Sequence, residues 1–283
     1  METGASVPAG RSLVFDSGIG GMGVVQALRD LLPALHIDYL ADTALFPYGE
    51  QPDDLLTARI VSLLVAACND LQPDVLVIAC NTASTIALPA LRARLNIPVV
   101  GCVPPIRWAG RVSETRVIGL LSTSATARRP YTLRLHQEFA ADCRLITHGA
   151  RRLADLAERA FLGEVIADTD IQHELDCLFG QPYGDEIDTV GLGCTHYTFL
   201  MDAFQRLSPK DVRWLDPASA VARQVGTVLQ TVSYGAEAAQ KGRFLMTRLP
   251  HTAPGLEAAA ARLGFKGWEL LTVPAPLMTI TES

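Results

Sequence analysis

Short apolar runs alternate along this chain with longer stretches in which apolar residues recur every three or four positions. A strand buried on both faces is typically a continuous apolar run, whereas a surface helix shows the longer period. The alternation therefore predicts an α/β fold built from repeated βα units, with mainly parallel sheets. The predicted strands are 12–16, 37–41, 74–79, 97–101, 116–121, 188–193 and 212–215, with weaker ones at 244–247 and 269–273. The predicted helices are 22–32, 53–71, 83–95, 126–139, 153–161, 199–207 and 218–230.

Composition narrows the class of protein. The chain has 283 residues, 49% of them hydrophobic and 19% charged, which is too apolar for a disordered chain. Its net charge of −6 argues against a nucleic-acid scaffold. Residues 1–12 lack the apolar core of a signal peptide, and no apolar run is long enough to span a membrane. Six cysteines in such a chain indicate reduced thiols, so we expect a cytoplasmic enzyme.

Polar side chains gather directly after the predicted strands. Open parallel sheets bind ligands beyond the carboxyl ends of their strands, so these residues are the candidates for a site. They comprise small hydroxyl and amide groups, two carboxylates, one imidazole and two thiols. The segments are Asp16-Ser17-Gly18, Asp42-Thr43, Pro47-Tyr48-Gly49, Cys80-Asn81-Thr82, Ser122 to Thr126, and Cys194-Thr195-His196.

Two of the six cysteines share one sequence context. Cys80 and Cys194 each follow an apolar strand that begins with an aspartate six residues earlier, Asp74 and Asp188. This internal pseudo-repeat places each thiol before a predicted helix, where the helix dipole and free N–H groups favour the thiolate. The cysteines at positions 68, 143 and 177 lack this strand-end context, and we expect them to pack in the interior.

Two thiols that face each other suggest proton transfer at carbon: one thiolate removes a proton, and the other thiol delivers one to the opposite face. A Cys–His–Asp hydrolase would instead need one nucleophile and one base. A disulfide would be unusual in a reducing compartment. The spacing of Cys and His matches no common metal motif, so we expect no metal.

Two cofactor hypotheses remain to be weighed. Pyridoxal chemistry needs a Schiff-base lysine, but Lys210, Lys241 and Lys266 all lie in turn-like segments. The run from Gly18 to Gly23 satisfies G-x-G-x-x-G, and Asp42 follows at a spacing typical of a dinucleotide site. Against that hypothesis, the carboxylate at position 16 would repel a pyrophosphate. The alternative is that Asp16 and Ser17 bind a substrate amino group and the glycines permit a tight turn.

Four sequence blocks carry a resemblance to a known family. The blocks that begin at Val14 (VFDSGIGGM), Phe46 (FPYGE), Ala79 (ACNTAS) and Gly193 (GCTHY) resemble motifs of the cofactor-independent aspartate/glutamate racemase family, in the family's order. The segment Gly119–Tyr131 is most similar to the Gram-negative branch, whose members racemise glutamate. The resemblance extends from about Ser12 to the C-terminal region.

The resemblance implies roles for individual residues. Cys80 would deprotonate D-glutamate and Cys194 L-glutamate, with Asp16 and His196 as their assistants. Glu158 would be a further acidic residue near the second thiol. The residues that would bind the substrate's carboxylates and ammonium are Ser17, Pro47, Tyr48, Gly49, Asn81, Thr82, Thr123, Thr126 and Thr195.

It also implies an architecture and a physiology. We expect two similar α/β domains with the active site between them, a discontinuous first domain of residues 1–104 plus 220–283 and a second of residues 105–219. The expected activity supplies D-glutamate for peptidoglycan, and therefore for cell shape, without a cofactor. An aspartate racemase is the nearest alternative enzyme, and DNA gyrase binding, known in some members, is an alternative of another class. We expect a monomer or homodimer, and an activator, UDP-N-acetylmuramoyl-L-alanine, bound at the interdomain crossing by Arg107, Arg111 and Arg116.

Overall fold

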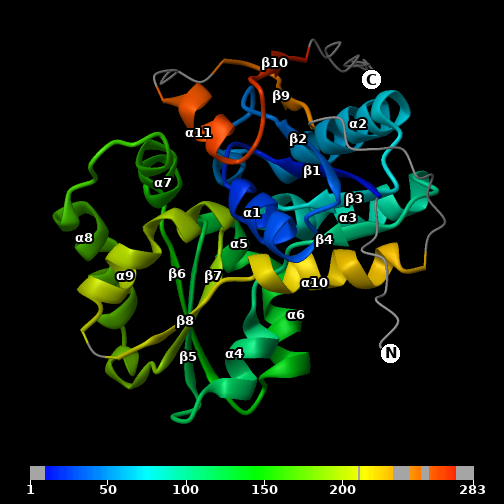
Figure 1. The fold of residues 1–283 in the computed structure, drawn as a ribbon. Coiled ribbons are helices and arrows are strands. Elements are labelled where there is room, and N and C mark those ends of the chain that lie inside the picture. Colours follow the sequence, from blue (N-terminus) through cyan, green and yellow to red (C-terminus); the bar gives the residue numbers. More distant parts are fainter. Residues whose placement is uncertain (1–9, 210, 232–241, 250–254, 272–283) are drawn as a thin grey trace, which may run out of the picture.

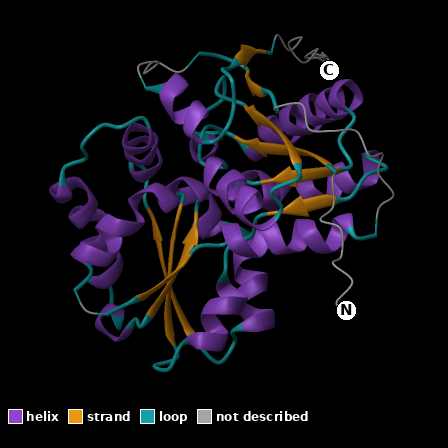
Figure 2. Ribbon diagram, viewed as in Figure 1, coloured by secondary structure: helices purple, strands orange, loops and turns teal. Residues whose placement is uncertain are grey.

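The computed structural model describes residues 10–209, 211–231, 242–249 and 255–271, and it forms two parallel β-sheets flanked by helices (Figure 1; Figure 2). The strands are β1 (Arg11–Asp16), β2 (His36–Ala41), β3 (Val75–Ile78), β4 (Val99–Gly101), β5 (Val117–Ser122), β6 (Arg144–Gly149), β7 (Thr189–Gly193), β8 (Arg213–Leu215), β9 (Phe244–Met246) and β10 (Glu269–Leu270). The α-helices are α1 (Met22–Leu31), α2 (Asp53–Leu71), α3 (Asn81–Arg94), α4 (Ile106–Val112), α5 (Ser124–Arg128), α6 (Pro130–Phe139), α7 (Leu153–Phe161), α8 (Asp168–Phe179), α9 (Met201–Leu207), α10 (Ala218–Leu229) and α11 (Leu256–Arg262). Three 3-10 turns are η1 (Tyr48–Glu50), η2 (Gly184–Glu186) and η3 (Thr195–Leu200).

The larger sheet has the order β10-β9-β2-β1-β3-β4, and its strands run parallel. Successive residues of a strand point to opposite faces, so Val14 joins one core and Phe15 the other. Helices α1, α10 and α11 cover the first face, and α2 and α3 cover the second. Both faces are buried, which explains the continuous apolar run of β1.

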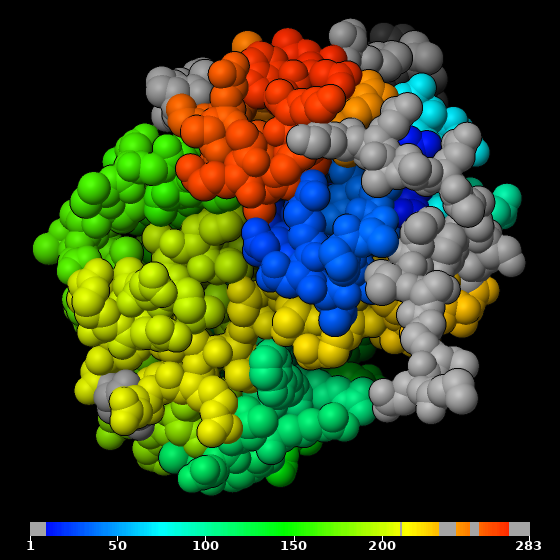
Figure 3. All heavy atoms as spheres, viewed as in Figure 1, coloured from blue at the N-terminus to red at the C-terminus, as the bar shows by residue number. Residues whose placement is uncertain are grey.

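The smaller sheet has the order β6-β5-β7-β8 and is also parallel. Helices α7, α8 and α9 cover one face, while α4 and α6 cover the other. The turn η3 contacts α1 of the larger unit, and in the space-filling view the two halves lie directly against one another (Figure 3).

The prediction of two parallel-sheet units is confirmed. The larger sheet takes its strands from both ends of the chain and the smaller sheet from the middle, as a discontinuous first domain requires. The boundaries at 104/105 and 219/220 stay a prediction. Every predicted strand exists, although residues 272 and 273 of the last one lie outside the described residues.

The sequence missed or merged several elements. Strand β6 is an edge strand in which only Ile146 is fully buried, so it has no apolar run to reveal it. The helix predicted at 126–139 is two helices, because Pro130 lacks the N–H needed to continue α5 and begins α6 instead. Helices α4, α8 and α11 were not predicted. Within the described part of the chain, no helix has both the length and the apolar character needed to cross a membrane.

Candidate active site

A cavity of about 300 Å³ lies where the carboxyl ends of the two sheets meet. The larger unit contributes residues that follow β1, β2 and β3, and the smaller unit contributes residues that follow β5 and β7, together with one from α7. The cavity is therefore built by five strand ends and one helix. Its lining residues are Ser17, Phe46, Pro47, Tyr48, Gly49, Cys80, Asn81, Thr82, Thr123, Ala154, Cys194, Thr195 and His196.

Cys80 is the N-cap residue of α3. Its Sγ accepts a hydrogen bond from the N–H of Ala83 at 3.5 Å, and its thiol donates to Ser17 Oγ at 3.9 Å. Burial raises the pKa of the Cys80 thiol to about 12, the charge of Asp16 adds to this, and the Ala83 N–H opposes it. The sequence predicted that the helix start would favour the thiolate. The helix start acts in that direction, but burial outweighs it, so Cys80 holds its proton at neutral pH.

Cys194 ends β7 and occupies a different local setting. The segment that follows is the 3-10 turn η3, and no N–H of that turn is capped by the thiol. Instead, Cys194 Sγ lies 3.8 Å from His196 Nδ1. The expectation that an α-helix starts directly after Cys194 is therefore wrong, because a 3-10 turn follows the thiol and the imidazole of His196 is its polar neighbour. Both thiols are only 6% exposed.

A buried carboxylate and an imidazole connect the two units. Asp16 accepts from the N–H of Gly18 and from the hydroxyl of Thr195, each at 2.9 Å. His196 Nε2 lies 3.1 Å from Glu158 Oε1 and 3.9 Å from Asp16 Oδ1. Burial raises the pKa of Asp16, although His196 partly offsets the effect. Burial lowers the pKa of His196, but Asp16, Cys194 and Glu158 together raise it well above its ordinary value.

The glycine loop is occupied by groups from the other unit. A Cβ at Gly18 would lie 2.0 Å from Glu158 Oε1, and one at Gly20 would lie 2.2 Å from the His196 ring. The glycines thus permit these two side chains to approach the loop, and Ile19 N–H donates to Glu158 at 3.0 Å. No room remains beside this loop for a pyrophosphate.

Asp42, the other residue of the dinucleotide hypothesis, has both of its carboxylate oxygens occupied by hydrogen bonds within the protein. Its carboxylate accepts from Arg59 at 2.8 and 3.0 Å, from the Tyr48 hydroxyl at 2.7 Å and from Thr247 at 2.7 Å. These contacts fix Tyr48 in the cavity wall and leave Asp42 without a free oxygen for a ribose. The dinucleotide hypothesis therefore finds no support in the geometry.

Three threonines join the two units beside the thiols. Thr82 Oγ1 lies 3.4 Å from Thr123 Oγ1 and 3.3 Å from Thr126 Oγ1, and Thr123 donates to Thr126 at 3.1 Å. Thr126 is not among the lining residues, but its hydroxyl contacts those of the other two. Asn81 lines the cavity, and its buried Oδ1 has no partner among the described residues. It is thus a free acceptor at the site.

Two lining residues were not predicted as site residues. Phe46 lies with its ring 5.4 Å from that of His196, and its signal was its place immediately before Pro47 in a recognisable block. Ala154 is a small residue in the first turn of α7, where nothing in its sequence context distinguishes it from a core position. Asp16 and Glu158, in contrast, contact His196 from outside the lining.

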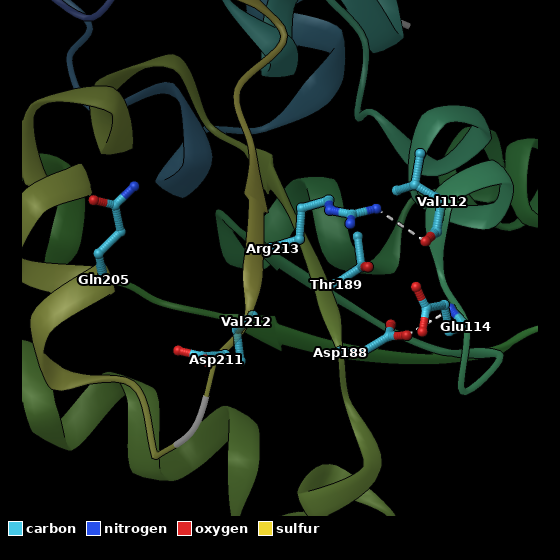
Figure 4. A pocket seen from close by; sticks show the side chains of 8 residues that line it. All are labelled: Val112, Glu114, Asp188, Thr189, Gln205, Asp211, Val212 and Arg213. Atoms are coloured by element: carbon cyan, nitrogen blue, oxygen red, sulfur yellow. Dashed lines mark hydrogen bonds between the residues drawn. The ribbon is translucent and has the colours of Figure 1, made fainter.

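A larger hollow of about 1000 Å³ lies at the other end of the smaller sheet, near the starts of β7 and β8 (Figure 4). The described residues that line it include Glu114, Asp188, Asp211 and Arg213, and none of them carries a thiol or an imidazole. The Asp188 carboxylate there accepts from the backbone N–H groups of Glu114 and Thr115 at 2.6 and 2.9 Å, so it stabilises the loop before β5. Size alone therefore does not locate the chemistry.

Two parallel α/β sheets with a small polar cavity between them, bearing one thiol from each, are the framework of a two-domain racemase. The sequence model of the family described as Asp/Glu/Hydantoin racemase matches residues 23–225, and the chain belongs to this family. It is an amino-acid racemase, an isomerase.

Individual relatives agree with this placement. A protein of Granulibacter bethesdensis named glutamate racemase is 51% identical over 78% of this chain and 79% of its own length. Another of that name, from Klebsiella pneumoniae, is 37% identical over 94% of this chain and 93% of its own. The crystal structure of Escherichia coli glutamate racemase in complex with L-glutamate and the activator UDP-MurNAc-Ala covers 95% of this chain and 100% of its own. Its TM-score is 0.88 at 35% identity.

Proposed function

We propose that this racemase interconverts L- and D-glutamate by moving protons at the α-carbon between Cys80 and Cys194, without a cofactor. The observation that carries the proposal is that one cavity of about 300 Å³ is lined by two buried thiols from two different sheets. The names of the similar proteins support glutamate as the substrate. The alternative substrate, aspartate, differs from glutamate by one methylene.

The proton balance of the reaction depends on the different surroundings of Cys80 and Cys194. Whichever thiol is the base must first be a thiolate, and the opposite residue must be a thiol that can donate. Cys80 would remove the α-proton of D-glutamate, and Cys194 would deliver one to the other face of the carbon; the reverse direction exchanges the roles. His196 Nδ1 lies 3.8 Å from Cys194 Sγ and its pKa is raised, so this imidazole would hold or return a proton at that sulfur. Asp16 is the titratable neighbour that most raises the pKa of Cys80, so its charge state governs how easily that thiol ionises.

Recognition of the substrate would rest on hydroxyls, amides and one unpaired acceptor. Among the described residues that line the cavity there is no lysine or arginine. The carboxylates of glutamate would therefore be bound by O–H and N–H donors, among them Ser17, Thr82, Thr123 and Thr195. The ammonium would be bound by Asn81 Oδ1, which is buried and lacks a partner in the described structure. Pro47, Tyr48 and Gly49 would shape the wall.

The biological role that we propose is the supply of D-glutamate for peptidoglycan in the cytoplasm. It rests on the family to which the chain belongs and on the names of its relatives. Binding of DNA gyrase and the choice between monomer and homodimer stay predictions.

A second ligand is proposed at the crossing between the units. A hollow of about 960 Å³ between α4 and α10 is lined by Arg107, Trp108, Arg111 and Arg223, among others, and a guanidinium matches the geometry of a diphosphate. Arg107 also lies over the ring of Phe139, 4.9 Å from its centroid. Because a structure of an E. coli relative was determined with UDP-MurNAc-Ala as activator, we propose that this hollow binds the same precursor.

The prediction for Arg116 needs correction. Its guanidinium donates to the carbonyls of Gly110 and Ser113 at 2.6 and 3.0 Å and pairs with Asp142. It is therefore committed to the loop between α4 and β5. The candidate cations for the diphosphate are instead Arg107, Arg111 and Arg223.

The test of the main proposal is circular dichroism of the purified protein with D-glutamate and D-aspartate in parallel, without pyridoxal or nucleotide. We expect racemisation of glutamate, with solvent deuterium at the α-carbon of the product when the reaction runs in deuterium oxide. Product that forms without deuterium would refute proton exchange through thiols. A preference for aspartate would refute the assignment of glutamate as the substrate.

The activator proposal has its own test. We expect turnover of L-glutamate to rise on addition of UDP-N-acetylmuramoyl-L-alanine, and the rise to be lost in Arg111→Ala. Full activity that the precursor does not change would refute the activator while leaving the racemase intact.

A further inference from the structure

Arg129 is a buried arginine that crosses from one unit to the other. It lies between α5 and α6 of the smaller-sheet unit, and its side chain is only 7% exposed. The guanidinium donates to both oxygens of Asp53, at 2.5 and 3.2 Å, and to Thr85 Oγ1 at 3.1 Å. Asp53 and Thr85 belong to α2 and α3 of the larger-sheet unit. Among the described residues, every hydrogen bond of this guanidinium therefore spans the two units.

The three residues of this clasp (Arg129, Asp53 and Thr85) adjoin segments that build the cavity. Asp53 begins α2 directly after the turn η1 that supplies Tyr48 and Gly49. Thr85 is one turn beyond Thr82 on the same helix, and its hydroxyl donates to the Thr82 carbonyl at 2.8 Å. Arg129 itself follows α5, whose N-cap is Thr123. One side chain thus ties together three segments of the cavity wall.

The clasp also lies beside an open hollow that leads toward the site. This hollow, of about 890 Å³, is lined by residues 49–53 on one side and by Ala125, Arg128, Arg129 and Pro130 on the other. Gly49 lines both the hollow and the thiol cavity. Because both thiols are almost fully buried, an amino acid can reach them only if the units separate along some edge. The edge closed by the clasp is the one that adjoins the hollow.

We propose that Arg129 is a positioning residue that holds the two units closed over the reacting thiols, and that breaking its contacts opens the edge through which the amino acid passes. The contribution of Arg129 is geometric. It keeps Thr123 against Thr82 and Gly49, and it touches neither thiol. The kinetic part of this inference rests on the proposed function, but closure of the site does not.

The buried cysteines provide a readout that needs no substrate. Peptide mass spectrometry after timed alkylation with iodoacetamide reports the accessibility of each thiol in the folded protein. In Arg129→Ala we expect Cys80 and Cys194 to be alkylated at least tenfold faster than in the wild type. Asp53→Asn should give a smaller increase, and Arg129→Lys an intermediate one, since an ammonium cannot make the forked contact to Asp53 together with the bond to Thr85.

Internal and external controls separate opening from unfolding. Cys68, buried on α2 in the core of the larger unit, should be alkylated at its wild-type rate in every variant. Arg128→Ala is the matched variant, because Arg128 is adjacent and exposed and makes no hydrogen bond or ion pair with the described residues. Its two cavity thiols should react as in the wild type.

These outcomes distinguish opening of the site from a general loss of stability of the fold. Unchanged labelling of Cys80 and Cys194 in Arg129→Ala would overturn the proposal, and so would an equal rise at Cys68. In the racemase assay, Arg129→Ala should raise the KM for glutamate about tenfold with a smaller change in kcat. A fall in kcat at constant KM would likewise overturn the proposal. If the wild-type protein did not racemise glutamate, the proposed function would fail, yet the labelling result would still decide whether Arg129 closes the site.

Discussion

The two strand–cysteine segments, β3 with Cys80 and β7 with Cys194, have the same structure as far as the cysteine. Asp74 accepts the backbone N–H of Arg11 at 2.7 Å, and Asp188 accepts those of Glu114 and Thr115. Each aspartate thereby stabilises the start of the neighbouring strand, β1 or β5. Each apolar strand then pairs with that neighbour in parallel. The sequence pseudo-repeat is thus a structural repeat.

In the residues that follow the cysteine, the two segments differ. Cys80 caps a helix of 14 residues and has the carboxylate of Asp16 as its titratable neighbour, whereas Cys194 precedes a 3-10 turn and contacts the imidazole of His196. One repeated strand end therefore presents two thiols with different proton partners. The difference shows that the repeat positions the two sulfurs, while residues outside it provide their polar neighbours.

This asymmetry cannot appear as a preferred direction of net reaction. The two enantiomers have equal free energies in water, so kcat/KM must be equal in both directions for the wild type and for every variant. It can appear in partial reactions, such as exchange of the α-proton without inversion. Net racemisation and proton exchange therefore have to be measured separately.

The largest effect is expected from replacing either thiol. Cys80→Ser and Cys194→Ser should each lower racemisation by about 10³-fold or more, because a serine hydroxyl is a far poorer base than a thiolate. Cys80→Ser should still exchange the α-proton of L-glutamate through Cys194, and Cys194→Ser that of D-glutamate through Cys80. Proton NMR in deuterium oxide measures both. Near wild-type racemisation in either variant, or exchange of the same enantiomer by both, would contradict the assignment.

His196→Asn should lower kcat by about 10²-fold, the lower range for a group that assists proton transfer. The His196→Asn variant should still bind glutamate, because the hydroxyls proposed to bind its carboxylates remain. Steady-state kinetics by circular dichroism measures the effect, with Phe46→Leu as a control that alters the contact to the ring but not its proton. Equal losses in the two variants would mean that His196 only packs.

The same substitution should change how stability depends on pH. The pKa of His196 is raised in the folded protein, so its ion pairing stabilises the fold fully below the ordinary pKa of about 6.5 and ceases to do so as pH rises through the raised value. From pH 6.5 upward the wild type should therefore lose more unfolding free energy than His196→Asn. Urea denaturation at a series of pH values tests this, and parallel curves would show that the imidazole is neutral.

A smaller effect compares the two aspartates of the repeat. Asp188→Ala should cost about 2 kcal/mol and Asp74→Ala about 1 kcal/mol of unfolding free energy, since the first carboxylate accepts two backbone N–H groups and the second accepts one. Desolvation acts to raise the pKa of Asp188, but its hydrogen bonds lower it on balance, so its contribution is present above about pH 4 and lost as pH falls. Urea denaturation at a series of pH values should show the difference between the wild type and Asp188→Ala shrinking as the pH falls below 4.

The smallest effect concerns Cys80 at alkaline pH. Its folded pKa is raised to about 12, so above pH 9 only the unfolded chain releases this proton, and stability falls as pH rises. Between pH 9 and pH 10 the wild type should lose about 1 kcal/mol more than Cys80→Ser. An equal loss in both proteins would show that the Cys80 thiol ionises in the folded state.

The sequence by itself determined the βα alternation, because strands buried on both faces must be continuous apolar runs, as in β1 and β3. It also predicted the sheet edge at which Cys80, Cys194 and His196 lie, since the carboxyl ends of parallel strands share one edge. Pattern alone could not reveal β6, whose edge position removes the apolar signal, or the break at Pro130 between two helical patterns that look continuous.

Only the tertiary structure decided what the glycine loop does. Its motif fitted a nucleotide, but Glu158 and His196 from the other unit fill the space that the missing Cβ atoms leave. It also decided the acidity of Cys80, because the burial that outweighs the helix start depends on the packing of both units around the thiol. The role of Arg129 had no sequence signal either, since its partners Asp53 and Thr85 are distant in the chain. Local pattern specifies strands, helices and their ends, whereas contacts between distant segments specify charge, access and proton partners.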